Sequence, residues 1–276
     1  MSRLIASTNV LAVRGDRNVE LPDRLAAEEP MEIRVGGPGE EPTALSVTMR
    51  TPGHDFELAV GFLRSEGIVA SSADVASVRY CDAPRGDEQR YNIVTVQLTR
   101  PAEVGGAHRR FSVTASCGIC GTATLDQLRR RCDPLGPGPS VAVSRLLALP
   151  DALRRSQRLF DQTGGLHAAG LSDAEGTVLS VREDVGRHNA VDKLVGRSLL
   201  DDALPLDDRV LVISGRVSFE IVQKAALAGI PILAAVSAPS SLAVTTARDL
   251  GMTVIGFIRG ARANVYSHPE RVDLAR

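Results

Sequence analysis

The chain of 276 residues contains no tryptophan, and aromatic side chains make up only 3% of it. Aromatic platforms that stack the bases of single-stranded nucleic acids are therefore not expected. Positive charge is not in excess either. The chain has 32 Lys and Arg residues and 33 Asp and Glu residues, which gives a net charge of -1. This balance excludes a protein that holds nucleic acid through bulk charge.

Long hydrophobic runs are also missing. No apolar stretch approaches the roughly 20 residues that a membrane-spanning helix needs. Charged residues are scattered through the first 30 positions, so there is no apolar core of a secretory signal. We therefore expect a cytoplasmic protein with no membrane partner. With 43% hydrophobic and 24% charged residues, the chain has the composition of a globular protein.

Cysteine is scarce, and the four present are too few for a disulfide scaffold of this size: Cys81, Cys117, Cys120 and Cys132. Cys117 and Cys120 form a C-x-x-C motif with no second pair, so a four-ligand structural zinc is not expected. A thiol–disulfide motif usually opens a helix, whereas a sulfur carrier holds sulfane sulfur on one thiolate and uses the second thiol for its release. The neighbouring Gly118 and Gly121 favour the carrier, because a flexible loop can visit both a donor and an acceptor.

The first half of the chain has the periodicity of an α+β domain. The first 30 residues are interpreted as a partly ordered arm. We then expect strands at 31–35 and 45–49, a helix at 55–67, and strands at 75–80 and 91–98. The Gly- and Pro-rich stretch 134–139 indicates a domain boundary. The predicted domains are 1–138, which ends in the C-x-x-C loop, and 139–276.

The second half alternates strands with helices. We expect helices at 145–160, 186–200, 218–227 and 240–250, and strands at 166–171, 177–181, 209–213, 230–236 and 252–258. Short links between the last strands and helices imply right-handed crossovers and parallel pairing. The predicted fold class is α/β (α+β overall): a cytidine-deaminase-like domain with a mixed, mostly parallel sheet, plus the smaller N-terminal α+β domain. The zinc motifs of a deaminase are absent, because no cysteine follows Cys132.

Each of the last three predicted strands ends in a small polar turn. The turns are Ser214-Gly215-Arg216, the stretch that begins at Ser237, and Arg259-Gly260-Ala261-Arg262. The ends of parallel strands meet at one edge of a sheet, where ligands bind. Helix N-termini attract anions and arginine forks bind phosphate. One such turn would indicate only a cap, but three at one edge predict an anionic ligand such as a nucleotide phosphate.

The polar run from Arg182 to Lys193 has two interpretations. Asp184, His188 and Asp192 are spaced by four, which predicts one face of a helix. An Asp–His pair could act as general acid and base, and a capped helix with a solvated face fits the spacing equally well. His167, which follows a glycine turn at 164–165, is interpreted as structural.

Several uncommon motifs run along the chain from about Glu28 to Val272: Thr51-Pro52, Gly61-Phe62-Leu63, Ser65-Glu66-Gly67-Ile68, Ser116-Cys117-Gly118-Ile119-Cys120-Gly121, Gly164-Gly165-Leu166-His167-Ala168-Ala169, Arg182 to Lys193, Ser214-Gly215-Arg216, Ser237-Ala238-Pro239, Gly256-Phe257-Ile258-Arg259 and Val265-Tyr266. In this combination the sequence resembles the FdhD/NarQ family of formate dehydrogenase accessory sulfurtransferases.

The resemblance implies an enzyme of the sulfurtransferase class that works as a sulfur carrier. Such a protein accepts sulfur from a cysteine desulfurase as a cysteine persulfide. It passes the sulfur to the molybdenum (or tungsten) bis(molybdopterin guanine dinucleotide) cofactor before that cofactor enters formate dehydrogenase. By the same resemblance Cys117 carries the persulfide, Cys120 assists, and the protein is a homodimer. The cofactor-binding segment of the family corresponds to Phe257, Ile258, Arg259, Gly260, Ala261 and Arg262, beside Ser214, Gly215, Arg216 and Ser237.

Two alternatives from other classes remain. A chaperone could bind and deliver the guanine dinucleotide cofactor without transferring sulfur. A thiol–disulfide oxidoreductase would instead form a stable disulfide between Cys117 and Cys120. The glycine-rich context of the motif and the resemblance over the whole chain favour the sulfur carrier over both.

Overall fold

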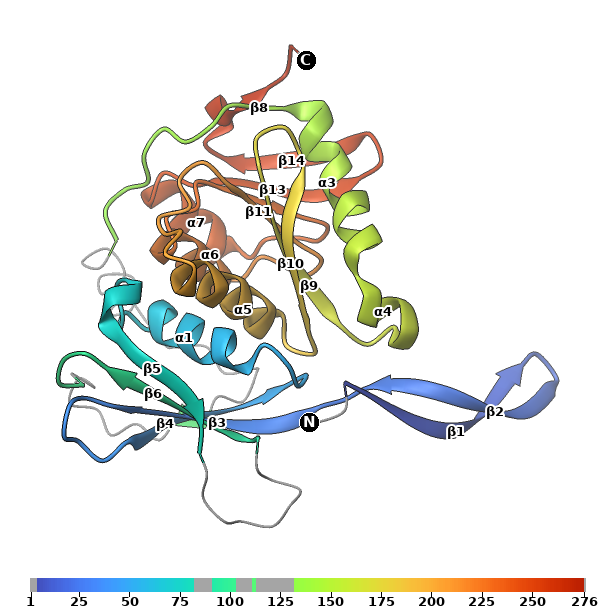
Figure 1. Ribbon diagram of the computed structural model, residues 1–276. Helices are drawn as coiled ribbons and strands as arrows, with labels where there is room; N and C mark the ends of the chain where they lie inside the picture. Colours follow the sequence, from blue (N-terminus) through green and yellow to red (C-terminus); the bar gives the residue numbers. More distant parts are fainter. Residues whose placement is uncertain (1–3, 82–90, 103–110, 113–131, 276) are drawn as a thin grey trace.

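The computed structural model describes residues 4–81, 91–102, 111–112 and 132–275 (Figure 1). Cys117 and Cys120 lie outside these ranges. Two large sheets organise the molecule, one of five strands in the N-terminal half and one of six in the C-terminal half. A separate two-stranded hairpin precedes both of them. Within the described ranges, no helix is both long and apolar enough to cross a membrane.

The N-terminal hairpin corrects the expectation of a partly ordered arm. Strands β1 (Ile5–Arg14) and β2 (Arg17–Ala26) pair antiparallel along their whole length and project from the body of the molecule (Figure 1). Leu11 and Val13 are 60% and 68% exposed, so their apolar side chains belong to no core. The backbone pairing of β1 with β2 therefore orders this segment. Because neither strand has a buried face, the sequence shows no apolar pattern that would reveal the hairpin.

The five-stranded sheet forms with α1 the core of the N-terminal half. Its strand order is β5-β6-β3-β4-β7, and its strands are β3 (Glu29–Gly36), β4 (Thr43–Arg50), β5 (Val75–Tyr80), β6 (Ile93–Leu98) and β7 (Phe111–Ser112). A 3-10 turn, η1 (Ser72–Asp74), precedes β5. Met31, Ile33 and Val35 alternate with polar residues along β3 and are buried. Helix α1 (Asp55–Ser65), which lies where the sequence predicts a helix, packs on that apolar face.

The six-stranded sheet has the order β10-β9-β11-β12-β13-β14. Its strands are β9 (His167–Ser172), β10 (Val178–Asp184), β11 (Val210–Ile213), β12 (Ile232–Ala235), β13 (Thr253–Arg259) and β14 (Arg262–Ser267). The mixed sheet is confirmed. Parallel pairing is restricted to β11–β12 and β12–β13, so the expectation of a mostly parallel sheet is corrected. Residues 259–262 turn the chain into β14, a strand that the sequence analysis missed.

Helices cover both faces of this sheet (Figure 1). Helix α3 (Val143–Ser156) packs on one face, and α5 (Arg187–Leu200), α6 (Phe219–Leu227) and α7 (Ser241–Asp249) pack on the other. The predicted helix at 145–160 breaks at Gln157, after which α4 (Arg158–Thr163) begins. Near the C-terminus, β15 (Val272–Asp273) follows the turn η3 (Pro269–Arg271) and pairs with β8 (Val141–Ala142).

The two halves meet where α1 packs against α5. A Cβ atom on Gly61 would lie 1.8 Å from the carbonyl oxygen of Asp192, and one on Gly196 would lie 1.8 Å from that of Glu57. Only glycine lets the two helix backbones approach so closely. Leu199 of α5 is part of the apolar core around α1, so the core of the first half extends onto the second. The proposed boundary at residue 138 stays a prediction.

Candidate functional site

A cavity of about 690 Å³ opens where the three parallel strands β11, β12 and β13 end. Its volume lies within the range of about 300–1,000 Å³ that is usual for small-molecule sites. We call it the strand-end cavity, and it is lined by Leu147, Pro150, Asp151, Leu153, Arg154, Gln157, Phe160, Gly164, Gly165, Leu166, His167, Ser214, Val236, Ile258, Arg259 and Gly260. The strand ends thus form one wall, and α3, α4 and the turn before β9 form the other.

Hydrogen bonds fix the strand-end turns at this edge of the sheet. The hydroxyl oxygen of Ser214 accepts from the amide of Ala168 at 2.9 Å, and the amide of Ser214 donates to the carbonyl of Ala168 at 3.0 Å. The carbonyl oxygen of Ser237 accepts from the amide of Phe257 at 3.2 Å. Because β11, β12 and β13 are neighbours in the sheet, the three turns lie side by side, which is the arrangement that the parallel strand order predicts.

Four of the predicted cofactor-binding residues line the strand-end cavity: Ser214, Ile258, Arg259 and Gly260. The other six do not border it: Gly215, Arg216, Ser237, Phe257, Ala261 and Arg262. Phe257 adopts a positive φ of 52° and is 50% exposed, an uncommon conformation for a bulky side chain. Arg216 and Arg262 are exposed in the neighbouring turns. A role of these ten residues in cofactor binding stays a prediction.

The helical wall of the cavity was not anticipated. Leu147, Asp151 and Arg154 come from successive turns of α3 and line the cavity together. The guanidinium of Arg154 lies 4.7 Å from the ring centroid of Phe160 and pairs with Asp161 at 2.5 Å. The available signal was the spacing of Asp151 and Arg154 four and seven residues after Leu147, which places polar groups next to an apolar helix face.

His167 lines the cavity and His188 stands in the first turn of α5, and the pKa of each imidazole is lowered from its ordinary value. Burial, followed by the nearby charge of Arg187, lowers the pKa of His167 below its usual value. Burial and the charges of Lys224 and Arg187 lower the pKa of His188 to about 4. The Nε2 atom of His188 lies 3.1 Å from the hydroxyl oxygen of Ser218, the residue before α6. Positive charge at the cavity therefore comes from arginine and not from these imidazoles.

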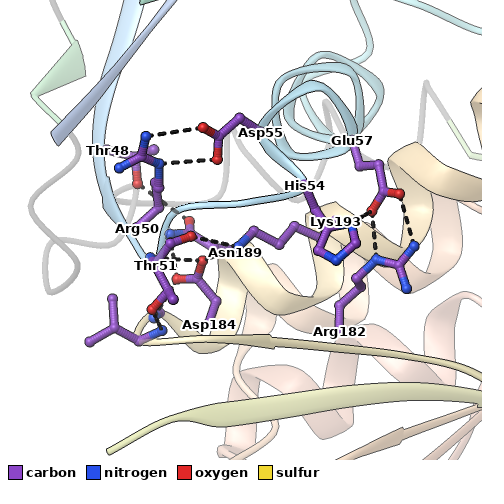
Figure 2. A network of polar contacts seen from close by, with 12 residues as sticks. Thr48, Arg50, Thr51, His54, Asp55, Glu57, Arg182, Asp184, Asn189 and Lys193 are labelled. Carbon is purple, nitrogen blue, oxygen red and sulfur yellow. Dashed lines mark hydrogen bonds and ion pairs between the residues drawn. The ribbon is translucent and has the colours of Figure 1, made fainter. Parts of the chain in front are cut away.

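The predicted common face of Asp184, His188 and Asp192 is wrong, because α5 begins only at Arg187 and Asp184 ends β10. Asp184 pairs instead with the ammonium of Lys193 at 2.7 Å, and it accepts a hydrogen bond from the amide of Thr51 at 3.1 Å (Figure 2). His188 and Asp192 have separate partners. The three residues therefore do not form a catalytic group.

A network of buried polar side chains joins the two halves around α1 and α5, and we call it the α1–α5 network. Its ion pairs are Asp184–Lys193, Asp192–Lys224, Arg50–Asp55 and Glu57–Arg182. Burial opposes ionisation of Glu57, but the hydrogen bonds from Arg182 hold its pKa at about 2. Figure 2 shows two contacts between the halves, Arg182 with Glu57 and the ammonium of Lys193 with the carbonyl of Thr51. The motifs at 51–52 and 182–193 thus supply structural contacts.

The two described cysteines, Cys81 and Cys132, are free thiols. Cys132 is buried, and burial raises the pKa of its thiol to about 11. Such a thiol is protonated at neutral pH and a poor nucleophile. Over the described ranges, no group of three His, Cys, Asp or Glu side chains is arranged to hold a metal ion. The roles predicted for Cys117 and Cys120 fall outside those ranges and stay predictions.

The mixed sheet and the strand-end cavity define an α+β protein with a cavity of small-molecule size at the ends of its parallel strands. Comparison with known proteins then assigns the family: the chain belongs to the FdhD/NarQ family, whose model matches residues 26–273. The resemblance noted in the sequence is therefore confirmed.

Individual relatives agree with this assignment. The chain is 50% identical over 280 residues to the sulfur carrier protein FdhD of Streptomyces coelicolor, covering 99% of this chain and 98% of the relative. Identity to the protein of the same name from Mycobacterium tuberculosis is 47% over 281 residues, covering 99% of this chain and 100% of the relative. A crystal structure described as a formate dehydrogenase accessory protein from Desulfotalea psychrophila superposes with a TM-score of 0.75 at 25% identity, covering 98% of this chain and 100% of that one.

Proposed function

We propose that this protein is a sulfur carrier required for formate dehydrogenase activity. It accepts sulfur from a cysteine desulfurase as a persulfide and transfers it to the bis(molybdopterin guanine dinucleotide) form of the molybdenum cofactor. The observation that carries the proposal is the strand-end cavity, in a chain 50% identical to a sulfur carrier protein. In this scheme the cofactor is the substrate that receives sulfur, and the enzyme is a sulfurtransferase.

The cavity supports binding of a phosphate-bearing ligand. Arg259 brings a guanidinium to its strand-end wall, next to Gly260, whose lack of a side chain leaves its backbone accessible. A hydroxyl group is available at Ser214. We assign the phosphates of the guanine dinucleotide to this wall, with Arg216 and Arg262 of the adjacent turns as further cationic partners. On this assignment GDP binds more tightly than ADP or inorganic phosphate.

The sulfur transfer that we propose consists of two thiol exchanges. The Cys117 thiolate attacks the terminal sulfur of the desulfurase persulfide, the S–S bond of that persulfide breaks, and the desulfurase thiolate leaves. Cys117 now carries the persulfide. The Cys120 thiolate then attacks the inner sulfur of Cys117, which releases hydrosulfide to the cofactor and leaves a disulfide between the two cysteines. A thiol reductant restores the starting state.

Mass spectrometry after incubation with a cysteine desulfurase and cysteine tests the carrier role. We expect one added sulfur atom on the peptide that contains Cys117, and none in the Cys117→Ala variant. Cys81→Ala, which removes a free thiol outside the motif, is the matched control and retains the added sulfur. If the Cys117→Ala protein still produced active, sulfurated formate dehydrogenase, the carrier role would be wrong.

The strand-end cavity also supports the alternative of a chaperone that binds the cofactor and transfers no sulfur, because no cysteine stands among the described residues that line it. The same experiment separates the two functions. A protein that binds GDP but gains no sulfur from the desulfurase is a chaperone.

We further propose a cytoplasmic homodimer, and light scattering that returned only the 29.3 kDa monomer would contradict the dimer.

A further inference from the structure

One residue of the strand-end cavity does not suit an anionic ligand. Asp151 of α3 is the single carboxylate among the described residues that line it. A carboxylate repels phosphate, so placing it in a pocket for a nucleotide is unfavourable unless it meets hydrogen-bond donors of the ligand. The side chain therefore indicates which part of the ligand lies against α3.

Among the described residues, Asp151 has no side-chain partner that would explain it as structural. Over the described ranges its carboxylate makes no hydrogen bond or ion pair, whereas Arg154, one turn further along α3, pairs with Asp161 and lies over the ring of Phe160. The nearest basic residue on this wall is thus already engaged. The oxygens of Asp151 remain available as acceptors for a ligand.

The surroundings of Asp151 suit a flat heterocycle. Leu147, Pro150 and Phe160 line the same wall and offer apolar contact to the faces of a ring. Arg259 stands on a different element, at the strand ends, where the phosphates are assigned. A nucleotide can therefore lie with its base at α3 and its phosphates at β13, so that each charged side chain meets the part of the ligand that it attracts.

Guanine and pterin share the donor pattern that a carboxylate recognises. Both present a ring N–H next to an exocyclic amino group, and two parallel N–H donors match the two oxygens of a carboxylate. Adenine presents a ring nitrogen acceptor at the corresponding place and would be repelled. We propose that Asp151 is the specificity-determining residue of the cavity and binds this amino–lactam edge. The inference rests on the proposed function and extends it to a named residue and a named edge of the ligand.

Calorimetric titration with GDP, ADP, xanthosine diphosphate and free pterin tests the inference. In Asp151→Asn, the side-chain amide can no longer accept from both donors but can donate to the C2 carbonyl of xanthine. We expect GDP affinity to fall by about tenfold to a hundredfold, in line with the discrimination that one bidentate base contact provides. The same substitution should raise the affinity for xanthosine diphosphate.

The control is Asp207→Asn, which removes one negative charge at an exposed position outside the cavity. It should bind all four ligands as the wild type does. A selective loss of GDP affinity in Asp151→Asn assigns the edge to guanine, and a selective loss of pterin affinity assigns it to the pterin. Either result supports recognition by Asp151.

Two other outcomes separate this inference from the proposed function. If Asp151→Asn bound GDP and pterin like the wild type, with no gain for xanthosine diphosphate, recognition by Asp151 would be wrong while the cavity remained a nucleotide site. If the wild-type protein bound none of the four ligands, the proposed cofactor site itself would be refuted. Circular dichroism confirms that each variant is folded before titration.

Discussion

Charged residues serve opposite purposes in two regions of this molecule. In the α1–α5 network they are buried and paired: Lys193 is 1% exposed and Asp184 is 0% exposed, with 2.7 Å between ammonium and carboxylate. In the strand-end cavity, Arg259 is exposed and Asp151 has no partner in the described part of the chain. The residue types are the same in both regions. The presence or absence of a protein partner distinguishes a structural charge from one that is free to bind a ligand.

Desolvation explains the difference. A buried charge is tolerated only where a partner and further hydrogen bonds replace water. The carbonyl of Thr51 accepts from Lys193 at 2.9 Å and so completes the network. Charges at the cavity remain hydrated until a ligand replaces the water, so they can still form hydrogen bonds and ion pairs with that ligand. Four substitutions or conditions test this comparison, in decreasing order of expected effect.

Lys193→Ala should lower the free energy of unfolding the most. It leaves the buried Asp184 without its cation, and breaking one half of a buried pair costs about 3–5 kcal/mol. Urea denaturation measures the loss. Arg209→Ala removes a surface pair with Asp208 outside the network and should cost less than about 1 kcal/mol. Equal losses in the two variants would contradict the distinction between buried and exposed charges.

Arg259→Ala should leave the stability of the protein unchanged and weaken its ligand binding. A hydrogen bond to a charged group contributes about 1.5–3 kcal/mol, which corresponds to a loss of GDP affinity of about tenfold to a hundredfold. Isothermal titration and thermal unfolding measure the two effects separately. Arg155→Ala, on the same helix as Asp151 but outside the cavity lining, is the control. A large drop in stability would place Arg259 with the structural charges.

Gly61→Ala tests the close helix contact on which the network depends. The new Cβ would meet the carbonyl of Asp192 at 1.8 Å, so α1 and α5 must move apart. Overpacking of this kind typically costs about 1–3 kcal/mol. Gly136→Ala adds a methyl group where nothing lies within 4 Å and should be close to neutral in the same denaturation experiment. A neutral Gly61→Ala would show that the helices tolerate a wider spacing.

Lowering the pH from 7 to 5 should destabilise the wild type through His188. Its pKa of about 4 in the folded protein lies below the value of an unfolded histidine, so the unfolded chain takes up a proton first and stability falls as the pH drops from about 6.5 towards 4. The side chain is 25% exposed, and we expect about 1–2 kcal/mol between pH 7 and pH 5. In His188→Gln the pH dependence should be smaller by that amount; an unchanged slope would mean that other groups cause it.

Most elements of the fold follow from periodicity in the sequence, since α1, the strands β3 to β6 and the alternating elements from β9 to β13 lie where they are expected. The N-terminal hairpin was missed because Leu11 and Val13 project into solvent and give no interior face. Strand β14 was missed because residues 259–262 were interpreted only as a loop with arginines. The helical wall of the cavity could not be anticipated, since nothing local in α3 shows which element stands opposite.

The two lysines of the chain are a further case in which the sequence did not predict the role of a residue. Their rarity looks like a compositional preference for arginine, yet Lys193 and Lys224 are the two cations buried against Asp184 and Asp192. No local pattern distinguishes them from exposed residues. A compact ammonium fits into a buried pair where the fork of an arginine would need more partners.

The amino-acid sequence by itself determined most elements between β3 and β13, the polar turns after the last parallel strands and membership of the FdhD/NarQ family, because each of these depends on residues close together in the chain. Only the tertiary structure decided which charges are structural and which face the cavity. Thr51 and Lys193, for example, are 142 positions apart and meet only after α1 packs on α5. Folding brings together residues that are distant along the chain. Whether a charged side chain gains such a partner determines whether it is structural or free to bind a ligand.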